Sequence, residues 1–439
     1  MPIRGLPVLF STLSFLCGRA LLPYMLLPLG LIDSTLCSSL DTRSPIAFAS
    51  RRVAVGRRPP LQLLLAFLGP VHARLTPGGN PPRTIRTATY QHDISSMRLS
   101  LLLLLAAALS AGAARAAPEP VPPAGGKLTP EYYSQSCPRG ERIIAEVVQS
   151  KQTTNPTTAA AVLRVFFHDC FVSGCDASVL IASNQFAKSE HDAEINHSLP
   201  GDAFDAVTRA KLALELECPG VVSCADILAL ASRVLVTMTG GPRYSVPLGR
   251  KDSLSSSPTA PDVELPHTNF TVDRLIQMFG AKGFTVQELV ALSGAHTLGF
   301  SHCKEFADRL FNFRDKGGKL EPFDPSMNPT YAKGLQVACK DYLNDSTIAA
   351  FNDIMTPGKF DNMYFLNLQR GLGLLGTDQE LWTDPRTKPF VQLYAANATT
   401  FFDDFGRAME KLSLLGVKTG ADGEIRRRCD TYNHGPMPK

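Results

Sequence analysis

Apolar residues recur at helical spacing through most of the chain after about residue 127, and polar side chains mark where helices should begin. In "SCADILALASRVLVTMTGG", Ser223 is the expected cap, Asp226 follows three residues later, and Gly240-Gly241 provides a stop. In "TVQELVALSGAHTLG", Thr285 and Glu288 have the spacing of a capping box ahead of another apolar run. Both stretches are predicted to be helices.

The stretch "NPTTAAAVLRVFFHDCF" predicts a further helix that runs to about Cys170. Asn155 is its expected cap and Pro156 lies in its expected first turn. Alternating strand patterns are rare, and "YSVPLGR" at 244–250 is one short candidate. The pattern therefore predicts a mainly α chain with long loops rich in Pro, Asn and Ser.

The front of the chain differs from the rest in charge and composition. Residues 1–116 hold twelve Arg and three Asp but no Lys or Glu, so the remainder of this +4 chain is mildly acidic and gives no reason to expect nucleic-acid binding. Residues 97–116 have the basic start, apolar run and small residues of a secretory signal peptide, and the run is short for a membrane span. We therefore expect three parts: an N-terminal extension at 1–96 that is absent from the mature protein, the signal peptide at 97–116, and one domain at 117–439.

Cysteine usage supports an oxidising compartment. The segment behind the signal peptide contains an even set, Cys137, Cys170, Cys175, Cys218, Cys224, Cys303, Cys339 and Cys429. This predicts four disulfides, although spacing alone leaves about 105 pairings open. The candidate glycan acceptors are Asn269, Asn344 and Asn397, with Asn196 as a fourth match to the same pattern.

Dense polar chemistry interrupts the apolar run "LRVFFHDCFVSGCDASVLI". Arg164 and His168 are four residues apart, so they share one face of the expected helix. A neutral histidine beside a cation suits heterolytic cleavage of a polar bond, because the histidine moves the proton and the cation stabilises the developing anion. A core histidine with a surface arginine would give the same pattern, so the pair alone leaves both interpretations open.

Oxygen donors gather directly after this pair. The candidate donors are the side chains of Asp169, Asp176 and Ser178 and the carbonyls of Val172 and Gly174. Hard oxygen ligands on one loop suit Ca²⁺. An ordinary polar turn remains the alternative at this point.

A second histidine follows the apolar helix of "LVALSGAHTLG". His296 is flanked by Gly294, Ala295 and Gly299, and we expect these small neighbours to let a flat, bulky ligand approach. A histidine there could ligate iron, and a carboxylate such as Asp378 could accept the other ring N–H. A structural histidine is the competing interpretation.

The segment "NDIMTPGKFDN" supplies a second group of oxygen donors. Asp353, Thr356 and Asp361 lie within it, and Thr297 directly follows the second histidine. A second Ca²⁺ site is one interpretation and a plain turn is the other.

Taken together, these motifs resemble those of the secretory plant haem peroxidases, class III, of the horseradish peroxidase type. The match runs from about residue 127 to 429 and includes "LRVFFHDCFVSGCDASVLI", "ERIIAEVV", "CPGVVSCADILALASR", "VPLGRKDS", "LVALSGAHTLG" and "FDNMYF" in order. The resemblance implies a helical, two-lobed haem peroxidase fold with haem between distal and proximal halves. It also implies one haem b and two Ca²⁺ ions.

The resemblance assigns a role to each candidate residue. It implies the proximal iron ligand His296 with its partner Asp378, the distal acid–base residue His168, the distal cation Arg164, the hydrogen-bond acceptor Asn196, the haem-lining Phe167 and Phe279, and the donor-channel Pro266. The implied distal Ca²⁺ ligands are Asp169, Val172, Gly174, Asp176 and Ser178, with Glu190 reaching the ion through water. The implied proximal Ca²⁺ ligands are Thr297, Asp353, Thr356, Lys359 through its carbonyl, and Asp361. The implied disulfides join Cys137 to Cys218, Cys170 to Cys175, Cys224 to Cys429 and Cys303 to Cys339.

These assignments imply an enzyme that reduces H₂O₂ and oxidises small phenolic donors by one-electron steps, in lignin or suberin metabolism, peroxide removal and the oxidative stress response. We expect a monomeric glycoprotein secreted to the cell wall, with the vacuole as the other destination, and no membrane partner. The main alternative is a secreted haem-binding wall protein with little turnover, which would not need the distal pair. An intracellular peroxidase conflicts with the signal peptide and cysteines, and a zinc enzyme conflicts with the absence of HExxH.

Overall fold

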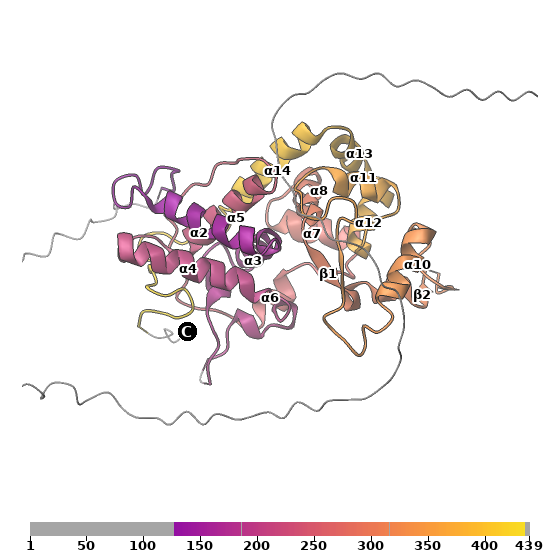
Figure 1. Cartoon of the computed structure of the whole chain (residues 1–439), viewed down its shortest axis with the longest axis horizontal. Helices are drawn as coiled ribbons and strands as arrows, with labels where there is room; N and C mark the ends of the chain where they lie inside the picture. Colours follow the sequence, from indigo (N-terminus) through magenta and orange to yellow (C-terminus); the bar gives the residue numbers. More distant parts are fainter. Residues whose placement is uncertain (1–126, 186, 316, 435–439) are drawn as a thin grey trace, which may run out of the picture. The chain divides into compact units, whose positions relative to one another are not determined.

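Helices account for almost all regular structure in the computed structural model, which describes residues 127–185, 187–315 and 317–434 (Figure 1). The expected mainly α architecture is therefore confirmed. The expected extension at 1–96 and signal peptide at 97–116 lie outside the described residues.

Four long helices form the first half of the fold. They are α2 (Gly140–Thr154), α3 (Thr158–Phe171), α4 (Gly201–Glu217) and α5 (Cys224–Met238). α2 packs against α4 and α5, and α3 packs against the same two helices and against α14. Because neighbours surround α3, most of its residues are buried, as its nearly continuous apolar sequence requires.

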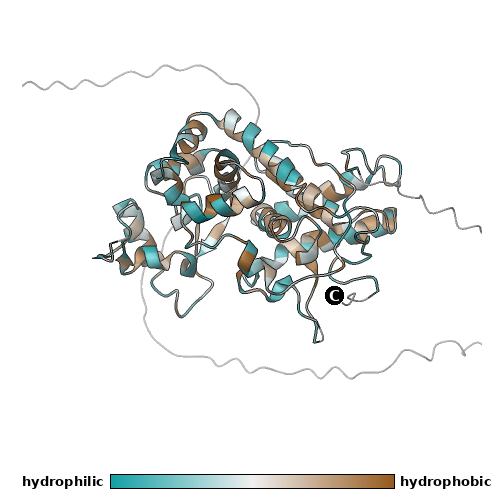
Figure 2. Ribbon diagram, turned by 180° about the vertical axis from the view of Figure 1, so that it is seen from behind, coloured by the Kyte–Doolittle hydropathy of each residue, from teal (hydrophilic) through white to brown (hydrophobic). Residues whose placement is uncertain are grey.

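A second group of helices builds the other half. It comprises α7 (Val272–Ala281), α8 (Val286–Ser293), α11 (Met363–Gln369), α12 (Gly376–Thr383), α13 (Lys388–Ala396) and α14 (Ala398–Leu412). α14 packs on α8 and α13 and also reaches α3, so it joins the two groups (Figure 1). Residues from both groups share one apolar core, and Figure 2 shows brown, apolar segments on helices throughout the fold.

Short elements connect these helices. They are α6 (Ala260–Glu264), α9 (Ala307–Leu310), α10 (Pro329–Ala338), η1 (Ser178–Leu180), η2 (Glu190–Asp192), η3 (Glu194–Asn196), η4 (Gly294–Thr297), η5 (Cys303–Glu305), β1 (Phe300–His302), β2 (Phe313–Arg314), β3 (Leu320–Glu321) and β4 (Ala349–Phe351). β1 pairs antiparallel with β4, and β2 pairs antiparallel with β3. A smaller apolar cluster lies under α9 and α10 and includes the Cys303–Cys339 disulfide.

Two of the three predicted helix starts are confirmed. The Ser223 side chain accepts from the backbone N–H of Asp226 at the start of α5, and Thr285 forms a capping box with Glu288 at the start of α8. The prediction for Asn155 was wrong. α3 begins at Thr158, and Asn155 instead ends α2, where its side-chain oxygen accepts from Thr157.

The predicted strand at 244–250 is reduced to a single bridge between Leu248 and Thr129. Pro247 has no N–H for a ladder. Beyond the bridge at Leu248, the backbone N–H groups of Gly249 and Arg250 donate to the buried Asp226 carboxylate at 2.7 and 3.2 Å. A side-chain acceptor has therefore replaced the partner strand.

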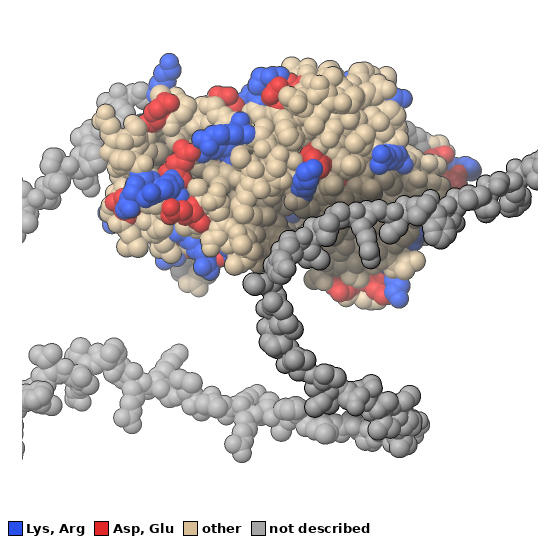
Figure 3. All heavy atoms as spheres, turned by 45° about the horizontal axis from the view of Figure 1, so that its top comes forward, with Lys and Arg blue, Asp and Glu red and all other residues tan. Residues whose placement is uncertain are grey.

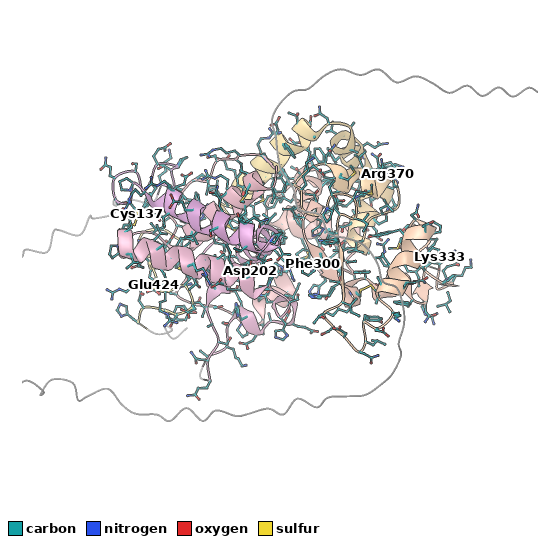
Figure 4. The ribbon with its side chains drawn as sticks, viewed as in Figure 1. Cys137, Asp202, Phe300, Lys333, Arg370 and Glu424 are labelled. Carbon is teal, nitrogen blue, oxygen red and sulfur yellow. A yellow bond between two sulfur atoms is a disulfide. The ribbon has the colours of Figure 1, made fainter. Side chains whose placement is uncertain are left out.

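Four disulfides cross-link the described part of the chain, and they join the pairs that the resemblance implied. They are Cys137–Cys218, Cys170–Cys175, Cys224–Cys429 and Cys303–Cys339. Cys137 lies just before α2 (Figure 4), and its bridge ties this helix to the end of α4.

The surface carries both signs of charge. Figure 3 shows basic and acidic side chains next to one another on one face, in keeping with ion pairs such as Lys151–Asp205 and Arg209–Asp205. Ion pairs of this kind at the surface contribute at most about 1 kcal/mol each.

Among the described helices, none has the length and apolar character needed to span a membrane.

Candidate active site

The first half of the site is the pair on α3. Arg164 and His168 lie one helical turn apart, and the Arg164 Nε donates toward His168 Nε2 at 3.3 Å. The guanidinium is held from its other side by Ser198, which accepts at 2.9 Å through its carbonyl and its hydroxyl. Burial lowers the pKa of Arg164, and the charge of Glu305 acts in the opposite direction. The cation is therefore fixed beside the imidazole.

His168 is held as a neutral base. Its Nδ1 lies 2.7 Å from Oδ1 of Asn196, whose own amide nitrogen donates to the Glu190 carbonyl at 2.8 Å. This chain makes the Asn196 oxygen the acceptor, so Nδ1 carries the proton and Nε2 keeps its lone pair. Burial, reinforced by the charge of Arg164, lowers the pKa of His168 to about 3.

The second half of the site lies on η4. His296 Nδ1 is 2.8 Å from Oδ1 of Asp378, a buried residue of α12. Burial works against protonation of His296, but the charge and hydrogen bond of Asp378 raise its pKa overall. The His296 side chain is 41% exposed, so the ring lies beside accessible space. Within the described part of the chain, its Nε2 forms no hydrogen bond.

The two halves are electrostatically coupled. Alongside burial, the charge of Arg164 opposes the rise in the pKa of His296 that Asp378 causes, although more than a hundred residues separate Arg164 and His296 along the chain. The structure thus brings both histidine motifs to one region, which spacing alone could not establish.

Aromatic rings line the distal side. Phe167 stacks on Phe171 with centroids 4.8 Å apart, and Phe279 of α7 lies 4.8 Å from Phe171 and 6.3 Å from Phe167. Phe167 also meets the His168 ring edge to face. The two expected haem-lining phenylalanines therefore belong to one cluster next to the distal histidine.

The segment with Pro266 is tied to the distal side. The neighbouring His267 contacts the carbonyl of Asp262 through Nε2 at 2.9 Å. The Asp262 carboxylate in turn accepts from the backbone of Glu194 and Ile195, directly before Asn196. Pro266 is partly exposed at this position.

The two glycines near His296 are required by packing within the protein. A Cβ on Gly294 would collide with the Phe401 ring, and one on Gly299, where φ is +84°, would lie 2.9 Å from the Ala160 side chain. Close approach of protein segments therefore requires glycine at both positions, and the approach of a flat ligand beside His296 stays a prediction.

The distal oxygen donors lie together and are only partly satisfied. The Asp169 carboxylate accepts from the backbone of Ala177 and Val179, whereas the Ser178 hydroxyl and one Glu190 oxygen are buried with no hydrogen-bond partner among described residues. Burial, together with the Asp169 charge, raises the pKa of Glu190 to about 9. Orphaned oxygens beside buried carboxylates are the surroundings that a cation would complete.

Two further contacts define the distal loop. Gly174 has a φ of +130° and its backbone lies against Gly416, so no side chain fits there. Asp176 pairs with Lys418 at 2.8 Å, a partner that the sequence did not suggest.

The proximal donors also converge. The Thr297 hydroxyl lies 3.4 Å from the Asp353 carboxylate and 3.3 Å from the Lys359 carbonyl. Thr356 bonds both Asp353 and Asp361, at 3.2 and 3.1 Å. All five expected donors thus meet in one cluster. Among the described residues, no group of three or more His, Cys, Asp or Glu is placed to hold a metal by these side chains alone.

Sequence reasoning assigned no role to two residues that the structure places in the site. Ser198 holds Arg164, and Tyr364 donates to Asp378 at 2.9 Å. Ser198 lies two residues after Asn196, so proximity in the chain could have indicated it. Tyr364 lies inside the motif "FDNMYF", but no local pattern pairs it with a carboxylate fourteen residues later.

Comparison with known proteins agrees with this geometry. The family model described as peroxidase matches residues 144–397. The chain is 58% identical to Peroxidase 65 and to Peroxidase 41 of Arabidopsis thaliana, in each case over 70% of this chain and about nine-tenths of the relative (90% and 91%). It is 54% identical to Peroxidase 6 of the same plant over 70% of this chain and 92% of the relative.

The chain therefore belongs to the peroxidase family, in the class III plant branch that its motifs resemble. It is an enzyme that reduces peroxide at the expense of a donor substrate.

Proposed function

We propose that this peroxidase binds one haem b with Nε2 of His296 as the iron ligand. The support is that Nδ1 of His296 is committed to Asp378, which leaves Nε2 free on an accessible side chain. The Asp378 carboxylate orients the ring and makes it a stronger donor. When bound, the haem iron supplies the redox chemistry, accepting oxidising equivalents from peroxide and passing them to donors one at a time.

His168 acts as the distal acid and base. Its neutral Nε2 takes a proton from H₂O₂ and returns it to the departing oxygen, which leaves as water. Arg164 stabilises the negative charge that develops on that oxygen. The observation that carries this proposal is the Asn196–His168–Arg164 arrangement, because it fixes the tautomer, lowers the pKa to about 3 and places the cation next to the base.

Two Ca²⁺ ions complete the protein. The distal ion fits the orphaned Ser178 hydroxyl and Glu190 oxygen, and the proximal ion fits the cluster around Thr297 and Asp353. Each proposed site includes a residue directly after one of the two histidines, since Asp169 follows His168 and Thr297 follows His296. Loss of either ion would therefore disturb the position of the adjacent imidazole.

The donors are small phenolics that approach past Pro266, and the enzyme is a monomeric glycoprotein secreted to the cell wall or vacuole. Secretion is supported by the leader at 97–116 and by four disulfides, which persist in oxidising compartments. Asn269, Asn344 and Asn397 are exposed and open to glycosylation, whereas Asn196 is buried. Lignin or suberin metabolism and peroxide removal are the corresponding roles.

The decisive experiment follows the reaction with peroxide in the full chain, secreted from a eukaryotic host and loaded with haem and Ca²⁺. One equivalent of H₂O₂ should change the haem absorption spectrum rapidly, and a phenol should restore it. His168→Ala should keep the ferric haem spectrum but slow the reaction with H₂O₂ by about 10²–10⁴-fold, the range for loss of a general acid–base.

The matched control is His197→Ala, because His197 is exposed and only one residue from Asn196. It should react like the wild type. An unchanged rate in His168→Ala would remove His168 from the mechanism, and failure of His296→Ala to weaken haem binding would remove His296 as the ligand.

A further inference from the structure

Asp378 serves two donors with one oxygen. Its Oδ1 accepts from His296 Nδ1 at 2.8 Å and from the Tyr364 hydroxyl at 2.9 Å. Its other oxygen, Oδ2, is buried and has no hydrogen-bond partner among the described residues. Both donors therefore draw on the negative charge of one oxygen, although an unused acceptor lies on the same carboxylate.

Tyr364 is built firmly into this position. Its side chain is buried, and its ring meets the His296 ring edge to face with centroids 6.2 Å apart. It belongs to α11, which packs against both α12, the helix of Asp378, and η4, the segment of His296.

The consequence concerns how strongly Asp378 polarises His296. A hydrogen bond to a charged acceptor is stronger than one between neutral groups, and it withdraws charge from that acceptor. Since Tyr364 draws on the same oxygen, less negative charge is left for the His296 N–H. The partner of a metal-ligating histidine sets its donor strength, so the hydroxyl opposes the effect of Asp378.

We propose that Tyr364 is a positioning residue that sets how much of the Asp378 charge reaches His296, and hence the reduction potential of the iron held there. The inference rests on the proposed role of His296 as the iron ligand. Removing the hydroxyl strengthens the His296–Asp378 bond, makes Nε2 a better donor and favours the ferric state.

The test is Tyr364→Phe, measured by spectroelectrochemical titration of the ferric–ferrous couple and by the iron–histidine stretching band of the ferrous protein. The equilibrium constant for reduction should fall about tenfold, which is about 59 mV for a one-electron couple. The stretching band should move to higher frequency. Tyr394→Phe is the matched control, because the buried Tyr394 hydroxyl donates at 2.8 Å to a different carboxylate, Asp404, and not to Asp378.

Two more variants keep the inference open to refutation. In an Asp378→Asn background, Tyr364→Phe should leave the potential unchanged, because the tyrosine acts through that carboxylate. Incorporation of 3-fluorotyrosine at position 364 keeps the shape and makes the hydroxyl a stronger donor, so it should raise the potential, which covers the case that Tyr364→Phe fails to fold.

The outcomes separate the two proposals. A wild type without an iron–histidine band, or with one that survives His296→Ala, refutes the ligand assignment. A normal wild-type band with no shift in either Tyr364 variant, or the same shift in Tyr394→Phe, refutes the role of Tyr364 alone.

Discussion

Because His168 is kept neutral in the folded protein, the free energy of unfolding should fall measurably in acid. The pKa of His168 falls from 6.5 to about 3 on folding, because burial and then the Arg164 charge disfavour the imidazolium. As the pH falls through 6.5, His168 therefore binds a proton in the unfolded chain but not in the folded protein, and the folded state loses stability. At about 1.4 kcal/mol per pKa unit, this loss is about 2 kcal/mol between pH 7 and pH 5, and about 5 kcal/mol once the pH is below 3.

The perturbation is His168→Gln, which cannot titrate. The free energy of unfolding is measured by urea denaturation at pH 7 and pH 5 for both proteins before haem is added. Between these two values the wild type should lose about 2 kcal/mol more than the variant does. In the haem-loaded wild type, the rate constant with H₂O₂ should stay level as the pH falls from 7 to about 4, because the base is still neutral there.

Equal losses in the wild type and in His168→Gln would refute the reasoning, since they would mean that the folded histidine accepts a proton as readily as the unfolded one. A rate constant that halves near pH 6.5 would contradict it independently. Replacement of the exposed His197 by Gln should reproduce the wild-type behaviour in both assays.

The remaining predictions concern stability and processing. Asp226→Asn should reduce the free energy of urea unfolding by about 3–5 kcal/mol, because it leaves the fully buried Arg250 without its counter-charge; a loss below 1 kcal/mol would contradict this. Replacing Cys303 and Cys339 together by Ser opens a loop with a sequence separation of 36 and should cost about 3–4 kcal/mol in the same assay. Exhaustive chelation of Ca²⁺ should lower peroxidase activity and the thermal midpoint together, and re-addition of Ca²⁺ should restore both. Sequencing of the secreted protein should find its N-terminus near Ala117, and a start before residue 97 would overturn the signal-peptide prediction.

The sequence by itself determined the local features. Caps such as Ser223 and Thr285 accept from backbone N–H groups three residues away, so the nearby sequence is enough to predict them. The same holds for Arg164 and His168, because helical geometry places residues four apart on one face. The motif order around them was enough to indicate the family, which the comparisons confirm.

Where local signals competed, the surrounding structure decided. Asn155 had a capping side chain but was used to end the preceding helix. The strand pattern at 244–250 lost its ladder because the buried Asp226 captured two of its N–H groups. Propensity ranks the options of a segment, and the tertiary partners choose among them.

Only the tertiary structure decided which distant groups meet. It brought Asp378 to His296 across 82 residues and Asn196 to His168 across 28. It also placed Tyr364 on the oxygen that His296 uses. No periodicity in a chain encodes such contacts, because they depend on how whole helices pack, and packing is set by the summed fit of buried side chains from every part of the sequence.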